Sequence, residues 1–254
     1  MHCCGGRAPG PDLIPGRRRQ ARPVPLSWRD FPGAGPLSNL PPVTKALLII
    51  NGVVFLLQFL LGSQLFFPFM LWPLGGASAG GMSFMPWQLV SYGFLHAGMF
   101  HLLFNMLVLY MFGAPLEYTW GQRRFLTYFL VCVVGAGLCQ LVVVSWSLAQ
   151  GGLPYPTLGA SGGVFGVLLA FGMLFPNHRV MLLIPPIPMK ARTLVIALGV
   201  IELIAGISGT RSGVAHFAHL GGMLFGWLLI QQWRGRPPFS RRPRGGGGGN
   251  VRRF

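Results

Sequence analysis

Two residues of the sequence, Ser161 and His219, have the side-chain types that hydrolysis of a peptide bond requires. A serine hydroxyl is a weak nucleophile, so a base must take its proton and later deliver it to the leaving amine, which is the usual task of histidine. Two further polar residues, His101 and Asn105, are four positions apart and therefore share one face of a helix. From that face both can donate hydrogen bonds to an oxyanion. The sequence thus offers a nucleophile, a base and oxyanion donors.

The elements that must position these residues are apolar. Of the 254 residues, 52% are hydrophobic and only 9% are charged. This composition is more apolar and less charged than a soluble domain of this length requires. Runs close to the ~20 residues that cross a ~30 Å hydrocarbon core recur along the chain. We expect an all-α polytopic membrane protein, a bundle of six transmembrane helices in one domain over residues 42–233. The runs cover about 43–62, 97–115, 125–146, 161–176, 193–208 and 214–231.

The net charge of +16 is concentrated at the two ends of the chain. Seven of the twenty Lys and Arg residues lie before or at the start of the first apolar run, the last of them being Lys45, and seven follow the last run. Basic segments beside apolar helices mark the cytoplasmic side and contact anionic lipid headgroups, and the loop charges alternate in the same sense. We therefore expect both termini in the cytoplasm, disordered basic tails at residues 1–41 and 234–254, and no nucleic-acid partner. No removable secretory signal is visible, and the compact layout favours a bacterial inner membrane.

The polar residues fall into one layer when depth is counted along their helices from the cytoplasmic ends. At about 1.5 Å per residue, Ser161 lies ~22 Å and His219 ~18 Å above those ends. His101 and Asn105 come out at ~22 Å and ~17 Å by the same rise. Because Ser161 then lies below the outer boundary of the hydrocarbon core, a water-filled cavity must reach it.

Glycines flank both members of the Ser–His pair. Ser161 begins its helix after Gly159, so its own N–H points out of the positive end of the helix dipole, where an oxyanion is stabilised. Small residues let transmembrane helices approach closely. We expect the two helices to come within hydrogen-bonding range of serine and histidine through packing positions at Gly159, Gly162, Gly222 and Gly226.

Three motifs together resemble the rhomboid family of intramembrane serine proteases. Gly159-Ala160-Ser161-Gly162 resembles the family's Gly-x-Ser-Gly nucleophile motif, and His219 with the glycines that follow it resembles the last helix of the family. HAGMFHLLFN, which begins at His96, resembles its His-x4-His-x3-Asn pattern. The resemblance covers about residues 43–231, in the same order and topology.

This resemblance implies a six-helix rhomboid-like bundle and a Ser161–His219 dyad without an acidic third member. It also implies an oxyanion site built from His101, Asn105 and the Ser161 backbone, with no metal and no other cofactor. Substrates would be membrane proteins, cut near the outer face of a transmembrane helix. One departure stands in the first outer loop, where Trp87-Gln88 replaces the family's usual Trp-Arg and leaves the headgroup anchoring of that loop open.

Other readings of the polar residues remain open at this stage. His216 lies one turn before His219, and depth alone allows either to be the base. His96 is left outside the catalytic set, and Glu202, an ionisable group ~16 Å deep in the fifth run, is given no role. A catalytically silent relative that binds transmembrane helices, or a small transporter that uses the polar layer, would fit the same composition.

Overall fold

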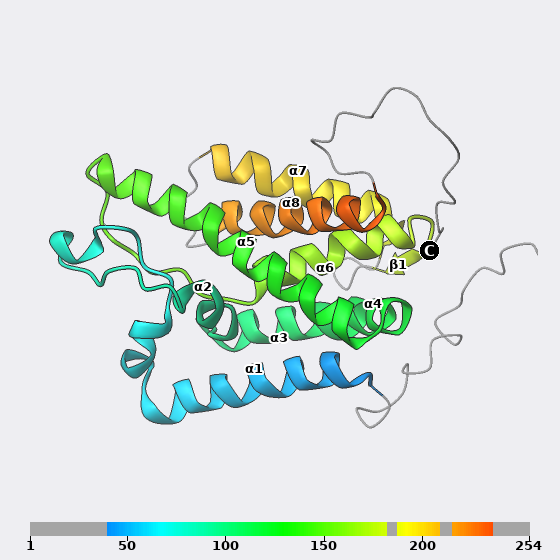
Figure 1. Cartoon of the computed structure of the whole chain (residues 1–254), viewed down its shortest axis with the longest axis horizontal. Helices are drawn as coiled ribbons and strands as arrows, with labels where there is room; N and C mark the ends of the chain where they lie inside the picture. Colours follow the sequence, from blue (N-terminus) through cyan, green and yellow to red (C-terminus); the bar gives the residue numbers. More distant parts are fainter. Residues whose placement is uncertain (1–39, 182–186, 209–214, 236–254) are drawn as a thin grey trace, which may run out of the picture.

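The computed structural model describes residues 40–181, 187–208 and 215–235, and these residues are almost entirely helical (Figure 1). The predicted tails at 1–41 and 234–254 lie outside the described residues except for their innermost positions. In chain order the elements are α1 (Pro42–Leu61), η3 (Ser63–Phe69), η4 (Gly76–Ala79), α2 (Gln88–Ser91), η5 (Tyr92–Phe94), α3 (Met99–Val108), η6 (Leu109–Gly113), α4 (Ala114–Trp120), α5 (Gln122–Ala149), α6 (Ser161–Leu174), β1 (Arg179–Met181), β2 (Pro188–Lys190), α7 (Ala191–Ile207) and α8 (His216–Trp233).

A helix occupies most of each predicted apolar run. Within the described residues, three helical segments are long and apolar enough to cross a membrane: α1, the continuous segment Met99–Trp120, and α5. Helix α6 is equally apolar but has only 14 residues. The helical fold is therefore confirmed, while the count of six spans stays a prediction.

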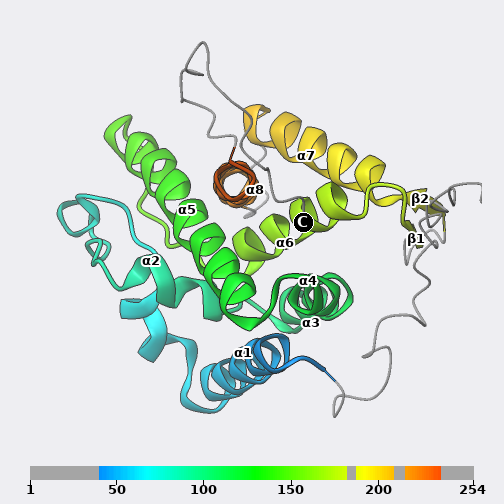
Figure 2. The same cartoon turned by 45° about the vertical axis from the view of Figure 1, so that its right-hand side comes forward.

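Helix α6 is the core of the bundle. Helices α5, α7 and α8 and the segment from α3 to α4 surround it, and α8 packs against both α5 and α6 (Figure 2). Nine of its fourteen residues are buried, among them four glycines that leave room for the neighbouring helices. The residue that begins this central helix is Ser161, so the nucleophile of the predicted dyad is held by the best-packed element.

Large apolar side chains face outward on the peripheral helices. On α1, Phe59 and Leu60 are 78% and 65% exposed, and on α7 Ile196 and Ile207 are 64% and 73% exposed. Exposed apolar faces of this extent are unstable in water and stable in lipid. The chain is a multi-pass membrane protein.

The segment from α3 to α4 contains a π-helical turn, η6, between its two α-helical parts. Pro115 follows directly in the first turn of α4, where its ring and its missing N–H would disrupt a regular α-helix. Widening the preceding turn is a known way for a helix to continue past such a residue. The helix therefore crosses the bundle without a break and carries Glu117 to the far end.

Glu117 caps the start of α1. Its carboxylate accepts hydrogen bonds from the backbone N–H of Val43 at 2.9 Å, and from the N–H and hydroxyl of Thr44 at 2.7 and 2.8 Å. The residue before α1, Pro41, supplies no side-chain cap of its own. A negative group at the N-terminus of a helix satisfies free donors and complements the helix dipole. Glu117 therefore joins α1 to α4 at a buried position.

The long loop between α1 and α3 is held from inside by Gln88. This side chain is fully buried; its carbonyl accepts from the Trp72 backbone N–H at 3.1 Å, and its amide donates to the Pro68 carbonyl at 3.1 Å. An isolated bridge between Leu71 and Thr157 then ties the loop to the segment before α6. Gln88, which stands where the family usually has arginine, thus faces the interior of the loop.

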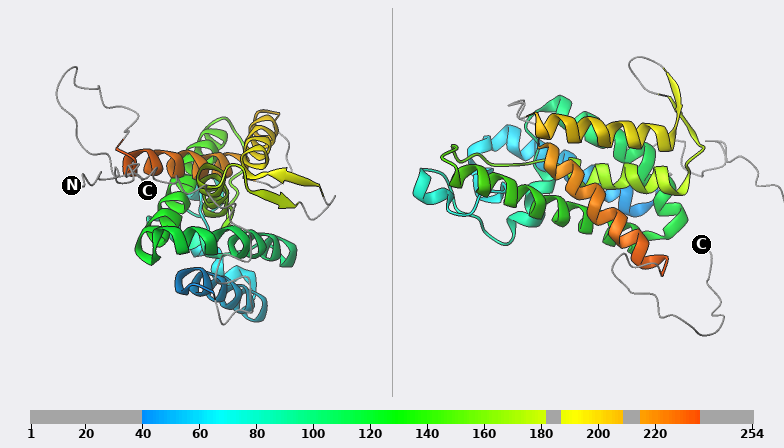
Figure 3. Two further views of the ribbon diagram at one scale, coloured as in Figure 1. Left: turned by 90° about the vertical axis from the view of Figure 1, so that its right-hand side faces the viewer. Right: turned by 90° about the horizontal axis from the view of Figure 1, so that it is seen from above.

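A short antiparallel hairpin connects α6 to α7. Strands β1 and β2 pair with Arg179 opposite Lys190, at the end of the bundle away from the α1–α3 loop (Figures 1 and 3). The start of α6 faces the opposite end (Figure 1), and Ser161 is the first residue of that helix. Among the described residues, the loops therefore separate into a basic end with the hairpin and an end near Ser161 whose loops carry no charged residue.

Candidate active site

Ser161 is positioned by the turn that precedes α6. Gly159 has φ +133°, a conformation that residues with a side chain rarely adopt, and its N–H donates to the Tyr92 carbonyl at 2.9 Å. A Cβ atom at Gly159 would lie 2.8 Å from Nε2 of His101 and 3.6 Å from Oγ of Ser161. The sequence therefore needs glycine here, because the backbone passes directly between these two side chains.

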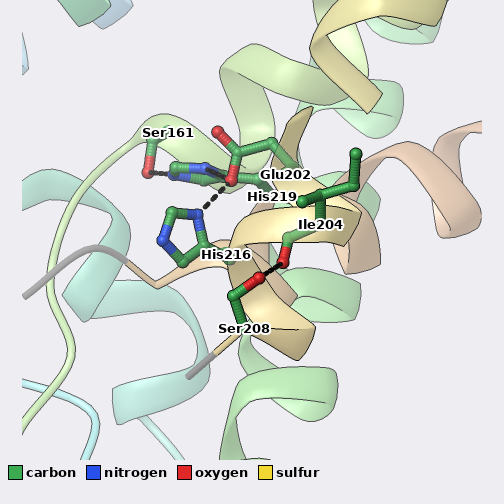
Figure 4. A network of polar contacts seen from close by, with 6 residues as sticks. All are labelled: Ser161, Glu202, Ile204, Ser208, His216 and His219. Carbon is green, nitrogen blue, oxygen red and sulfur yellow. Dashed lines mark hydrogen bonds and ion pairs between the residues drawn. The ribbon is translucent and has the colours of Figure 1, made fainter. Parts of the chain in front are cut away.

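His219 meets Ser161 from the neighbouring helix. Its Nε2 lies 2.8 Å from the Ser161 Oγ, a normal hydrogen-bond distance (Figure 4). The ring of Phe165, one turn below Ser161 on α6, stacks on the imidazole with centroids 4.2 Å apart and planes within 5°. The nucleophile and the base are thus hydrogen-bonded, and Phe165 packs against one face of the base.

Backbone contact between α6 and α8 makes this hydrogen bond geometrically accessible. A Cβ at Gly222 would lie 2.7 Å from the carbonyl carbon of Gly162, so α8 has no room for a side chain there, and a Cβ at Gly162 would collide with the side chain of Ala136 on α5. Gly226 faces the Tyr128 hydroxyl and the Cys132 sulfur of α5. Of the predicted packing glycines, Gly162 and Gly222 therefore meet across α6 and α8, Gly226 meets α5, and Gly159 meets His101.

The two predicted oxyanion donors lie on α3, and the first of them, His101, lies beside the turn that carries the serine. The ring of His101 borders the same backbone as the Ser161 hydroxyl, and its Nδ1 is 3.4 Å from the N–H of Ala97. Asn105 is buried, and its amide donates to the His101 carbonyl at 2.8 Å. His101 is therefore adjacent to the reacting pair, while one N–H of Asn105 is used within its own helix.

His96 lies in the loop before α3 and packs edge-on against His101, with ring centroids 5.1 Å apart. Burial, together with the neighbouring His101, lowers the pKa of His96 to about 4. A neutral imidazole at this position supports the His101 ring without adding a charge to the site.

Glu202 of α7 joins the site, although no role is predicted for it from the sequence. Its Oε2 lies 2.9 Å from Nδ1 of His219 and 2.7 Å from Nδ1 of His216 (Figure 4). All three side chains are only 10–13% exposed. The structure therefore brings Ser161, His219 and Glu202 into one line of contacts and turns Nδ1 of His216 toward the carboxylate.

The contact between Glu202 and His219 could have been suspected from the depths of the two residues along their helices. Glu202 at ~16 Å and His219 at ~18 Å were in the same layer, and an ionisable residue at that depth needs a partner. Depth alone does not show in which direction the Glu202 side chain points around the axis of α7.

Glu202, His216 and His219 are also the one group in the described part of the chain whose ligand atoms, all within 4.8 Å of one another, could hold a metal ion. Ligand atoms around a tetrahedral zinc ion lie roughly 3.3 Å apart, as follows from zinc–nitrogen bonds of ~2.0–2.1 Å. The direct contacts of 2.7 and 2.9 Å are shorter, so the arrangement fits ion pairing better than ligation. The prediction of a metal-free site stays a prediction.

Comparison with known proteins covers the part of the chain that carries this site. Residues 83–233, more than half of the chain, match the family profile described as a rhomboid domain. The chain is 33% identical over 148 residues to "Rhomboid protein 1, mitochondrial" of Saccharomyces cerevisiae, covering 56% of this chain and 41% of that protein.

Two further relatives show a similar degree of likeness. "Presenilin-associated rhomboid-like protein A, mitochondrial" of Danio rerio is 32% identical over 173 residues, with 61% of this chain and 44% of that protein covered. "Rhomboid protease GluP" of Bacillus subtilis is 30% identical over 142 residues, with 56% and 25% covered. The chain thus spans less than half the length of each of these three relatives.

Proposed function

The chain belongs to the rhomboid family, and on that premise we propose that it is an intramembrane serine endopeptidase that cleaves other membrane proteins with a Ser161–His219 pair. The observation that carries the proposal is the 2.8 Å hydrogen bond between Ser161 Oγ and His219 Nε2. Serine gains nucleophilicity only when a base is within such reach, and here the two side chains come from separate helices. A serine kept for packing alone has no need of that partner.

In the first half of the proposed reaction, Ser161 Oγ attacks the carbonyl carbon of the substrate while its proton passes to His219 Nε2. The tetrahedral intermediate collapses when the carbon–nitrogen bond breaks, and the proton on Nε2 moves to the leaving amine. An acyl-enzyme remains on Ser161. Water then attacks the ester, gives one proton to Nε2, and the acid product leaves as that proton returns to Ser161.

The negative oxygen of each tetrahedral intermediate needs donors fixed in advance. The N–H of Ser161 has no partner within α6, because it belongs to the first residue of the helix. His101 borders the same backbone and is the second donor we propose. Asn105 is the third, through the amide N–H that does not bond to the His101 carbonyl.

We further propose that the protein has six spans, formed by α1, α3 through α4, α5, α6, α7 and α8. Both termini then lie in the cytoplasm, because the hairpin with Arg179 and Lys190, the first turn of α7 with Arg192, and both tails are basic. In this orientation Ser161 opens toward the outer side, and the basic tails rest on anionic headgroups. We also propose that the protein lies in a bacterial inner membrane and that its substrates are transmembrane proteins.

The proposal is tested by co-expressing the full chain with a single-span reporter whose helix contains Gly and Ala near its outer end. The wild type should release the outer fragment, and Ser161→Ala should release none. Ser208→Ala is a matched control, since that hydroxyl donates only to the Ile204 carbonyl of its own helix. Equal release by the wild type and Ser161→Ala would refute the proposed function.

A further inference from the structure

A single carboxylate oxygen lies between the two histidines at the start of α8. Oε2 of Glu202 is 2.9 Å from Nδ1 of His219 and 2.7 Å from Nδ1 of His216, and His219 in turn contacts Ser161 through its other nitrogen (Figure 4). These contacts join α6, α7 and α8. Glu202 thus touches the base on the side opposite the nucleophile.

The carboxylate decides which nitrogen of His219 carries the proton. An ionised carboxylate only accepts hydrogen bonds, so a bare Nδ1 lone pair facing it at 2.9 Å would be repelled. The favoured tautomer of His219 therefore has its proton on Nδ1 and a lone pair on Nε2. That lone pair is what Ser161 needs as an acceptor for its hydroxyl proton.

The two contacts of Glu202 differ in quality. The contact with His216 is a well-formed hydrogen bond, whereas the contact with His219 has ion-pair distance but not the direction of a hydrogen bond. Its effect on His219 is therefore electrostatic: it favours Nδ1–H in the resting state and stabilises the imidazolium that forms when Ser161 attacks. The bond to His216 fixes the carboxylate in place for this task.

We propose that Glu202 is a positioning residue that completes a Ser161–His219–Glu202 arrangement, with His216 as the anchor of the carboxylate. This inference rests on the proposed function, because it concerns the same base. It adds an acidic third member, supplied by α7, to a site whose sequence motifs imply only a serine and a histidine. Phe165 stacks on the ring and Glu202 faces its edge, so His219 is restrained in both tilt and rotation.

The test compares the purified full-length wild type with Glu202→Gln, Glu202→Asp and the control Ser208→Ala, using the single-span reporter in lipid vesicles. Glu202→Gln removes the charge at nearly constant size, so kcat should fall by about 10- to 100-fold while KM stays within about twofold. Glu202→Asp keeps the charge one methylene further away and should recover part of kcat. Ser208→Ala should behave as the wild type.

A spectroscopic measurement separates positioning from a structural role. With ¹⁵N-labelled histidine and a His219→Gln spectrum for assignment, the wild type should show His219 protonated at Nδ1, and Glu202→Gln should populate the Nε2–H tautomer. Because only folded protein gives the native His219 signal, a loss of folded material does not imitate this change. An unchanged tautomer with a kcat loss that Glu202→Asp does not recover would overturn the proposal.

Two different outcomes would refute the positioning role of Glu202 and the proposed endopeptidase function. If the wild type cleaves the reporter and Glu202→Gln does so at the same kcat, the positioning role is refuted while the endopeptidase stands. If the wild type and Ser161→Ala cleave equally, the endopeptidase itself is refuted, and the role of Glu202 in its base is refuted with it.

Discussion

Replacing Gly222 with alanine tests whether close contact between α6 and α8 sets the Ser161–His219 distance. The new Cβ would lie 2.7 Å from the carbonyl carbon of Gly162, with the carbonyl oxygen nearer still. Both are backbone atoms, which cannot move aside as the end of a flexible side chain can. Since two carbon atoms rest about 3.5–4.0 Å apart, the helices must separate locally by roughly 1 Å.

The separation falls directly on the reacting pair. Gly162 follows Ser161 in sequence, and Gly222 lies one turn after His219. A shift of roughly 1 Å takes the O–N distance of 2.8 Å to about 3.8 Å, beyond the ~3.2 Å limit of a good hydrogen bond. Misplacement of this size costs about 100-fold in rate, and overpacking costs about 1–3 kcal/mol of stability.

The assay is the rate of labelling by a fluorophosphonate, which reacts only with an activated serine, together with the thermal midpoint in detergent. Gly52→Ala is the matched control, because a Cβ at that position of α1 would meet nothing within 4 Å. The control should label as the wild type does. Wild-type labelling and an unchanged midpoint in Gly222→Ala would show that the glycine contact does not position the dyad.

Two further substitutions test long-range contacts that hold the scaffold. Glu117→Ala removes three hydrogen bonds from the buried start of α1 and should lower the free energy of unfolding by about 2–4 kcal/mol; an unchanged thermal midpoint would argue against the cap. Gln88→Ala leaves the Trp72 N–H and the Pro68 carbonyl without their partner, so hydrogen exchange should rise in the α1–α3 loop and not in α8. Equal exchange in the variant and the wild type would remove Gln88 as the anchor of that loop.

Hydropathy predicted the helices well, because it depends on local sequence. Helix α6 begins at Ser161, the residue expected to start it, and the structure places His219 beside it. What depth cannot give is the rotation of each helix about its axis, since tertiary packing such as the contact between Gly162 and Gly222 sets it. For this reason the sequence places Glu202 at nearly the same counted depth as His219 but does not reveal its contacts with His216 and His219.

Contacts between segments distant in sequence were equally invisible. Nothing in the local sequence connects Glu117 to the start of α1, more than seventy positions earlier. Gln88 was judged by the headgroup role of the arginine expected there, whereas a buried amide can satisfy loop backbone groups on both its oxygen and its nitrogen. In each case most of the partners are backbone groups, and the sequence pattern carries no record of such pairings.

The central claim is that Ser161 is a nucleophile activated by His219, and the site of covalent modification tests it most directly. The purified full-length protein is treated with a fluorophosphonate, digested and analysed by mass spectrometry. We predict one phosphonylated residue, Ser161, and no adduct in His219→Gln. An adduct on another residue, or an equal yield at Ser161 without His219, would contradict it.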